Sequence, residues 1–201
     1  MSIAAVASFL SYRKGNRRFI VLTILLVLTI IIEKLSLSPH FGNYVYTMHI
    51  FNLIEYSLFC LYFLQCCTNR KLKLCVGWSI PLFAIYGTCV SIFKYQYDHL
   101  PADNLDLEGI LLFIMYTHLL FNIDVDINRL VYTHPDFWIA TGIMVFFGGV
   151  FVLFGVYSGL KHASGDNAGK LYESISHPLN LFLYTCINVG IICSLKYKKY
   201  S

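Results

Sequence analysis

Charge is what this sequence has least of. Only 13% of its 201 residues are charged, whereas a soluble domain carries about 25%. Hydrophobic residues make up 57% of the chain, and the mean hydropathy is +0.63. This departure predicts a protein that crosses a membrane several times, with lipids as its surroundings. The formal net charge of +4 is too small to favour nucleic acid as a partner.

The signature motifs of common enzymes are missing as well. The chain has no HExxH, GxSxG, P-loop or GxGxxG pattern, and its last apolar run has no central lysine to hold retinal. The cysteines lack the CxxC spacing of zinc or redox sites, so we expect small apolar residues in a reduced setting. They are Cys60, Cys66, Cys67, Cys75, Cys89, Cys186 and Cys193. No cofactor is identified, and whether the protein is an enzyme stays open.

What the sequence does have is long apolar runs separated by short polar turns. Each run is about 19–24 residues long, which matches a hydrocarbon core of about 30 Å at 1.5 Å per residue. We therefore predict an all-α transmembrane helix bundle with six full spans, forming a single domain over residues 1–201. The predicted spans are Phe19–Leu37, Tyr44–Gln65, Leu74–Phe93, Leu105–Ile123, Phe137–Leu160 and Ser174–Leu195.

A shorter apolar run, Ser2–Tyr12, precedes the first span and is followed by a basic cluster. It has about half of the roughly 20 residues that a spanning helix needs. A cleaved signal peptide carries its charges before the apolar run, so this order argues against one. The run is either the inner end of a truncated first helix, which makes the bundle seven-helix-like, or a short interfacial helix.

The loops on the two sides of the predicted bundle differ in positive charge. One side has only Lys94, Lys161 and Lys170. The other side has eleven cations: Arg13, Lys14, Arg17, Arg18, Arg70, Lys71, Lys73, Arg129, Lys196, Lys198 and Lys199. Because Lys and Arg collect on the cytoplasmic side, the C-terminus is predicted to be cytoplasmic.

Polar side chains within the spans gather in the half that this orientation makes the outer one. A charged group at a helix centre costs about 2.5–3.5 kcal/mol and is kept where it faces a bundle interior or a wet cavity. On the second span, three such residues cover an arc of about 120°, which is one helix face. We predict a ligand-binding site formed by His49, Asn52, Glu55, Glu108, His177 and Asn180.

Each of these residues also has a structural interpretation. Asn52 and Asn180 are suited to hydrogen bonds between helices. His177 precedes Pro178 near the expected start of the last span and is suited to a helix cap. Glu55 is the hardest to explain structurally, because a carboxylate near the middle of the membrane must be protonated or paired.

Three functions fit this set of residues. The first is a binding or sensing bundle for a small molecule, a lipid or a cation, which signals through a membrane protein partner or a second copy. The second is an intramembrane metal-dependent hydrolase acting on a lipid. Its metal candidates are His49, Glu55 and His177, and the third ligand beside the two histidines is one of Glu33, Glu55 and Glu108. The third is a transporter coupled to protons or cations, with Glu55 as the relay. We favour the first.

Three stretches of the chain carry a resemblance: His49–Phe63, His134–Phe154 and His177–Asn188. Together they resemble a family of uncharacterised small bacterial membrane proteins with six or seven helices and unknown function. That family has a helix with the His and Glu seen here at positions 49 and 55, and a PxFWI-type entry into a glycine-containing helix. The resemblance implies a multi-pass protein of the bacterial inner membrane, and it supplies no activity.

Labelling of cysteines introduced at Ser38 and at Ser201 tests the predicted topology. Ser38 follows the first span on the outer side, whereas Ser201 belongs to the cytoplasmic C-terminus. An impermeant thiol reagent should therefore reach the two positions from opposite sides of the membrane. Labelling of both from the same side would overturn this topology.

Overall fold

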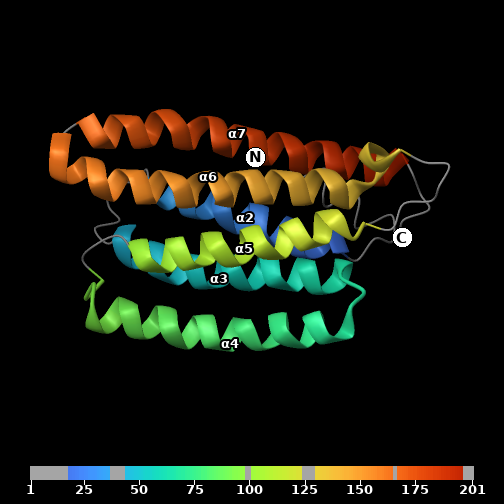
Figure 1. Cartoon of the computed structure of the whole chain (residues 1–201), viewed down its shortest axis with the longest axis horizontal. Helices are drawn as coiled ribbons and strands as arrows, with labels where there is room; N and C mark the ends of the chain where they lie inside the picture. The colour runs from blue at the N-terminus through green and yellow to red at the C-terminus, as the bar shows by residue number, and fades with distance from the viewer. Residues whose placement is uncertain (1–17, 37–43, 98–100, 124–129, 165–166, 197–201) are drawn as a thin grey trace. The chain divides into compact units, whose positions relative to one another are not determined.

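The protein is all-helical throughout the residues that the computed structural model describes, which are 18–36, 44–97, 101–123, 130–164 and 167–196. Long α-helices make up most of the described chain (Figure 1). Their bounds are α2 Arg18–Ser36, α3 Tyr44–Cys66, α4 Arg70–Phe93, α5 Ala102–Phe121, α6 Pro135–Ser164 and α7 Asn167–Lys196, with a 3₁₀ turn η1 at Val131–Thr133. The prediction of an all-α membrane protein with six helices is confirmed.

Five of these helices have the length and hydropathy to cross a membrane: α3, α4, α5, α6 and α7. In α2 the described apolar stretch is shorter, Arg18–Ile32. The predicted N-terminal helix at Ser2–Tyr12 lies outside the described residues.

The helices α4 and α7 begin furthest before the apolar runs that predicted them, at Arg70 instead of Leu74 and at Asn167 instead of Ser174. The start of α4 is capped by Asn69, whose side chain accepts hydrogen bonds from the backbone N–H groups of Lys71 and Leu72 at 3.0 and 3.4 Å. Such a cap accepts hydrogen bonds from backbone N–H groups of the first turn, which have no acceptor within the helix. In α7 the helix begins at Asn167 and continues through Pro178, so the interpretation of His177 as a cap at a helix start is wrong.

The chain divides into two compact units. The first comprises Met1–Asn104 with Lys198–Ser201, and among the described residues it contains α2, α3, α4 and the first turn of α5. The second comprises Leu105–Tyr197 with the rest of α5, η1, α6 and α7. The single domain over 1–201 stays a prediction.

In the first unit, α3 packs against both α2 and α4. The centre of the α3–α4 interface is aromatic, because the rings of Tyr56 and Phe83 lie 4.1 Å apart between centroids. The Tyr56 hydroxyl also donates to Ser79 Oγ at 2.8 Å. Nearer the end of α4, a Cβ on Gly87 would lie 2.5 Å from Leu53 Cδ2. The glycine therefore allows the two helices to approach closely.

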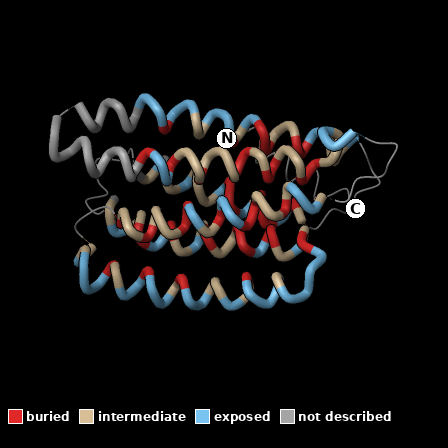
Figure 2. Tube along the Cα trace, viewed as in Figure 1, coloured by how far each residue is buried: buried red, intermediate tan, exposed pale blue. Residues whose placement is uncertain are grey.

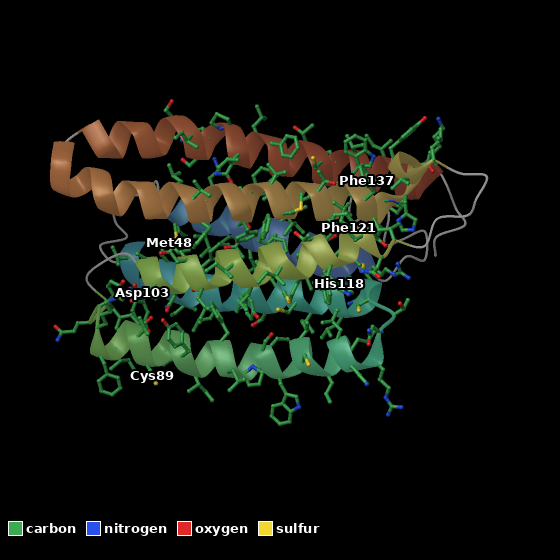
Figure 3. All side chains as sticks on the ribbon, in the orientation of Figure 1. Met48, Cys89, Asp103, His118, Phe121 and Phe137 are labelled. Carbon is green, nitrogen blue, oxygen red and sulfur yellow. The ribbon has the colours of Figure 1, made fainter. Side chains whose placement is uncertain are left out.

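The opposite face of α4 is apolar and exposed. The buried residues of α4 form one stripe on the other side of the helix, Val76, Phe83, Gly87 and Ser91. Exposed residues follow its outer edge (Figure 2). Trp78, Leu82 and Ile85 are each 64% exposed, and Cys89 points away from the unit in Figure 3. In a membrane such a face is suited to contact with lipid tails.

In the second unit, α6 and α7 pack along glycines. A Cβ on Gly142 would lie 2.7 Å from Cys186 Cβ, and one on Gly190 would lie 2.9 Å from the Pro135 carbonyl oxygen. Gly148 has the same function towards α5, because a Cβ there would lie 2.8 Å from Phe113 Cδ2. Glycine on α6 therefore permits close helix approach.

Substituting Gly190 with alanine tests the close α6–α7 contact. The new methyl group meets backbone that cannot move aside easily, so we expect Gly190→Ala to lower the free energy of unfolding by about 1–3 kcal/mol. Gly77→Ala is the matched control, since a Cβ at Gly77 would have no heavy atom within 4 Å. Denaturant unfolding in detergent micelles measures both variants. Equal stability of the two would contradict the contact.

Candidate functional site

The candidate site lies at the end of the first unit where α3 begins, α4 ends and α5 begins. Each helix contributes one buried polar residue: His49 is 1% exposed, Ser91 2% and Asn104 0%. His49 Nδ1 lies 2.7 Å from Ser91 Oγ, and Asn104 Nδ2 donates to the same oxygen at 3.4 Å. One serine hydroxyl therefore connects all three helices.

The role of Asn104 in this network is fixed by its two amide hydrogens. Its Nδ2 donates to the Gly87 carbonyl oxygen at 3.3 Å and to Ser91 Oγ. Between Ser91 and His49 the direction depends on the tautomer of the ring: the hydroxyl donates when the ring proton is on Nε2 and accepts when it is on Nδ1.

One polar atom of the network accepts no hydrogen bond from the described residues. Asn104 Oδ1 is buried and has no hydrogen-bond partner within the described part of the structure. A buried acceptor without a partner costs about 1–3 kcal/mol, and such groups in native proteins call for an explanation, such as a bound water or ligand.

Aromatic rings cover the network on the side of the α4–α5 turn. The His49 ring lies 5.1 Å from the Tyr97 ring in an edge-to-face arrangement and 6.1 Å from the Tyr95 ring. The Tyr97 ring also lies 5.0 Å from the ring of Tyr46 on α3. We call Tyr46, Tyr95 and Tyr97 the aromatic cap.

The backbone of this cap is strained. Gln96 and Tyr97 have positive φ angles of 48° and 60°, a conformation that residues other than glycine seldom adopt. Such residues cost about 1–3 kcal/mol each and cluster at functional sites. The strained turn is what places the Tyr97 ring against His49.

An ion pair closes the outer side of the cap. Lys94 pairs with Asp103, and its ammonium lies 5.4 Å from the centre of the Tyr95 ring. The hydrogen bond to Asp103 raises the pKa of the Lys94 ammonium above its ordinary value. The backbone N–H of Asp103 donates to the Tyr95 hydroxyl at 3.4 Å. Met48 and Asp103 lie at the same end of the unit (Figure 3).

The sequence-predicted site residues divide between the two units. His49, Asn52 and Glu55 belong to the first, where Asn52 is 2% exposed, one turn along α3 from His49, and Glu55 is half-buried. The others belong to the second, where Glu108 is buried, Asn180 is half-buried and His177 is exposed. A single site that includes all six stays a prediction.

Sequence reasoning missed Ser91, Asn104 and the aromatic cap. Ser91 lies inside the predicted third span, and Asn104 lay in the loop before the predicted fourth span. The available signal was the antiparallel pairing of consecutive spans, which brings the end of α4 to the level of His49.

The described side chains do not gather into a set of metal ligands. Within the described ranges, no three His, Cys, Asp or Glu residues come close enough together to hold a metal ion. The metal candidates His49, Glu55 and His177 stay a prediction.

The comparisons with known proteins identify no relative. No family model, no curated protein and no solved structure matches the chain. The class of the protein therefore comes from its own helices: it is an all-helical membrane protein. The resemblance to uncharacterised bacterial membrane proteins stays a prediction.

A double-mutant cycle between His49 and Ser91 tests the network. We expect each alanine variant to cost about 1–3 kcal/mol of stability, because it leaves a buried partner unsatisfied. The pair should couple by about 0.5–1.5 kcal/mol. His177→Ala is the control, and as an exposed position it should change stability by less than about 0.5 kcal/mol. Additive effects at positions 49 and 91, measured by unfolding in detergent, would contradict the hydrogen bond.

Proposed function

We propose that this protein is a binding or sensing protein of the membrane. Its ligand is a small polar molecule or the polar part of a lipid, and its site is the buried network of His49, Ser91 and Asn104. The charge distribution of the loops favours the outer side of a plasma membrane for this site, and a bacterial inner membrane follows from the resemblance. A signal would pass to a membrane protein partner or a second copy of the chain.

The observation that carries the proposal is the buried Asn104 Oδ1. Its amide nitrogen uses both hydrogens within the protein, while the oxygen has no partner in the described structure. A ligand that donates one hydrogen bond would remove the cost of this unsatisfied acceptor. The expected ligand group is therefore an O–H or N–H donor, such as a hydroxyl or a protonated amine.

The surroundings of the network support a ligand over a purely structural role. The aromatic cap is held by two strained residues, Gln96 and Tyr97, and strain of this kind persists where it contributes to function. The metal-dependent hydrolase and the coupled transporter have no comparable observation in their favour.

Native mass spectrometry of the full chain tests the proposal. The protein is placed in nanodiscs of phosphatidylethanolamine and phosphatidylglycerol and then released in the gas phase. We expect the wild type to keep one bound lipid or co-purified molecule. Asn104→Leu, which keeps the side-chain volume but removes every polar atom, should lose it.

Asn188→Leu is the matched control, because the Asn188 amide bonds to the Tyr184 carbonyl of its own helix at 2.8 Å. This variant should retain the bound molecule. Thermal unfolding of both variants shows that each is folded. Equal retention by the wild type and by folded Asn104→Leu would overturn the proposal.

A further inference from the structure

We propose that the same site is an acyl-transfer centre, in which Ser91 attacks the acyl ester of a membrane lipid and His49 is the base. This inference rests on the proposed function, since it names the class of molecule that the site binds. It differs from the metal-dependent hydrolase considered from the sequence, because the nucleophile here is a side chain of the protein.

The first support is the geometry of the two reacting side chains. Ser91 Oγ and His49 Nδ1 are 2.7 Å apart, within the range of about 2.6–3.2 Å in which a base activates a serine nucleophile. They come from different helices, α4 and α3, so the pair depends on the tertiary fold. Both are almost fully buried, and a water-poor site strengthens electrostatic effects on a reaction.

The second support is a contrast with other hydroxyls of the unit. Ser57 donates to the Leu53 carbonyl at 2.7 Å, and Ser79 donates to the Val76 carbonyl at 2.8 Å. Both bonds lie within the serine's own helix, which is the usual way for a helix to satisfy a hydroxyl. The Ser91 hydroxyl oxygen instead lies 2.7 Å from an imidazole nitrogen on another helix.

Asn104 supplies the third part of the centre. Its Nδ2 lies 3.4 Å from Ser91 Oγ, beside the place where the carbonyl oxygen of a bound ester becomes an oxyanion. An amide N–H at that place stabilises the developing negative charge. When Ser91 Oγ bonds to the ester carbonyl carbon, the Nδ2 hydrogen that Ser91 Oγ had accepted turns to the neighbouring oxyanion. Asn104 therefore stabilises the oxyanion, while Ser91 is the nucleophile.

The reaction balances with water as its only co-reactant. Ser91 Oγ bonds to the ester carbonyl carbon, and its proton moves to His49 Nδ1. The bond from that carbon to the alcohol oxygen then breaks, and the departing alcohol takes the proton. Water next attacks the acyl-serine, giving one proton to His49, which returns it to Ser91 Oγ as the carboxylic acid leaves.

The place of Ser91 in the helix fits a lipid ester. It lies two residues before the end of α4 at Phe93, which at 1.5 Å per residue is about 3 Å below the helix end. Glycerolipid esters lie at this level, between the hydrocarbon core and the headgroups. Movement of the strained cap residues Gln96 and Tyr97 would open the site to a lipid.

A lipophilic fluorophosphonate tests the inference directly, because it bonds irreversibly to activated serines. The full-length protein is labelled in phosphatidylethanolamine–phosphatidylglycerol vesicles, and the adduct is mapped by peptide mass spectrometry. We expect the adduct on Ser91, and we expect His49→Gln to slow labelling at least about 100-fold. Glutamine keeps a hydrogen-bonding side chain at position 49, so the variant retains the fold but not the base.

Ser79→Ala is the matched control, because Ser79 lies in the same α3–α4 interface without a histidine partner. It should label at the wild-type rate. Absence of an adduct on Ser91 in the folded wild type, or an unchanged rate in His49→Gln, overturns the acyl-transfer centre. A lipid retained in native mass spectrometry without any Ser91 adduct overturns only this inference. An adduct with equal lipid retention in Asn104→Leu overturns only the ligand role of Asn104 Oδ1.

Discussion

A polar group inside a membrane must find its partner within the protein, because hydrocarbon offers none. The hydrogen bond between His49 and Ser91 meets this constraint within the first unit. It joins the start of α3 to the end of α4, and Asn104 adds the start of α5. Three chain segments therefore share one network, in addition to the Tyr56–Ser79 hydrogen bond between α3 and α4 and the Lys94–Asp103 ion pair. The close approach of Leu53 to Gly87 brings the helices near enough for it to form.

The hydrogen bonds of the first unit distinguish polar residues with a structural role from polar residues with a functional one. Ser57, Ser79 and Thr88 satisfy their hydroxyls on carbonyls of their own helices, so they place few demands on their neighbours. Ser91 depends on two other helices, lies beneath a strained aromatic turn and adjoins an unsatisfied amide oxygen. Polar residues that are harder to satisfy are better explained by a ligand or a reaction than by packing.

The helices could be predicted because each apolar run is long enough to span hydrocarbon. The observed helix ends differ from the predicted ones where polar residues extend a helix beyond its apolar run. The cap at Asn69 begins α4 before its apolar run. In the site, His49 and Asn52 stood out because polar residues are rare in an apolar helix. Ser91 did not, since serine is common in such helices and satisfies itself locally. Asn104 was expected in a loop, and only the tertiary pairing of α4 with α3 reveals its role.

The protonation of the His49 ring is the most direct measure of this account. Nitrogen-15 magnetic resonance of the full chain in lipid bilayers, with His49 assigned by substitution, distinguishes the two neutral tautomers and the imidazolium. Because the base inferred at His49 needs the lone pair of Nδ1 opposite the Ser91 hydroxyl, we predict the neutral ring with its proton on Nε2 at neutral pH. A ring with its proton on Nδ1, or one with both nitrogens protonated, would contradict the acyl-transfer chemistry inferred for this site.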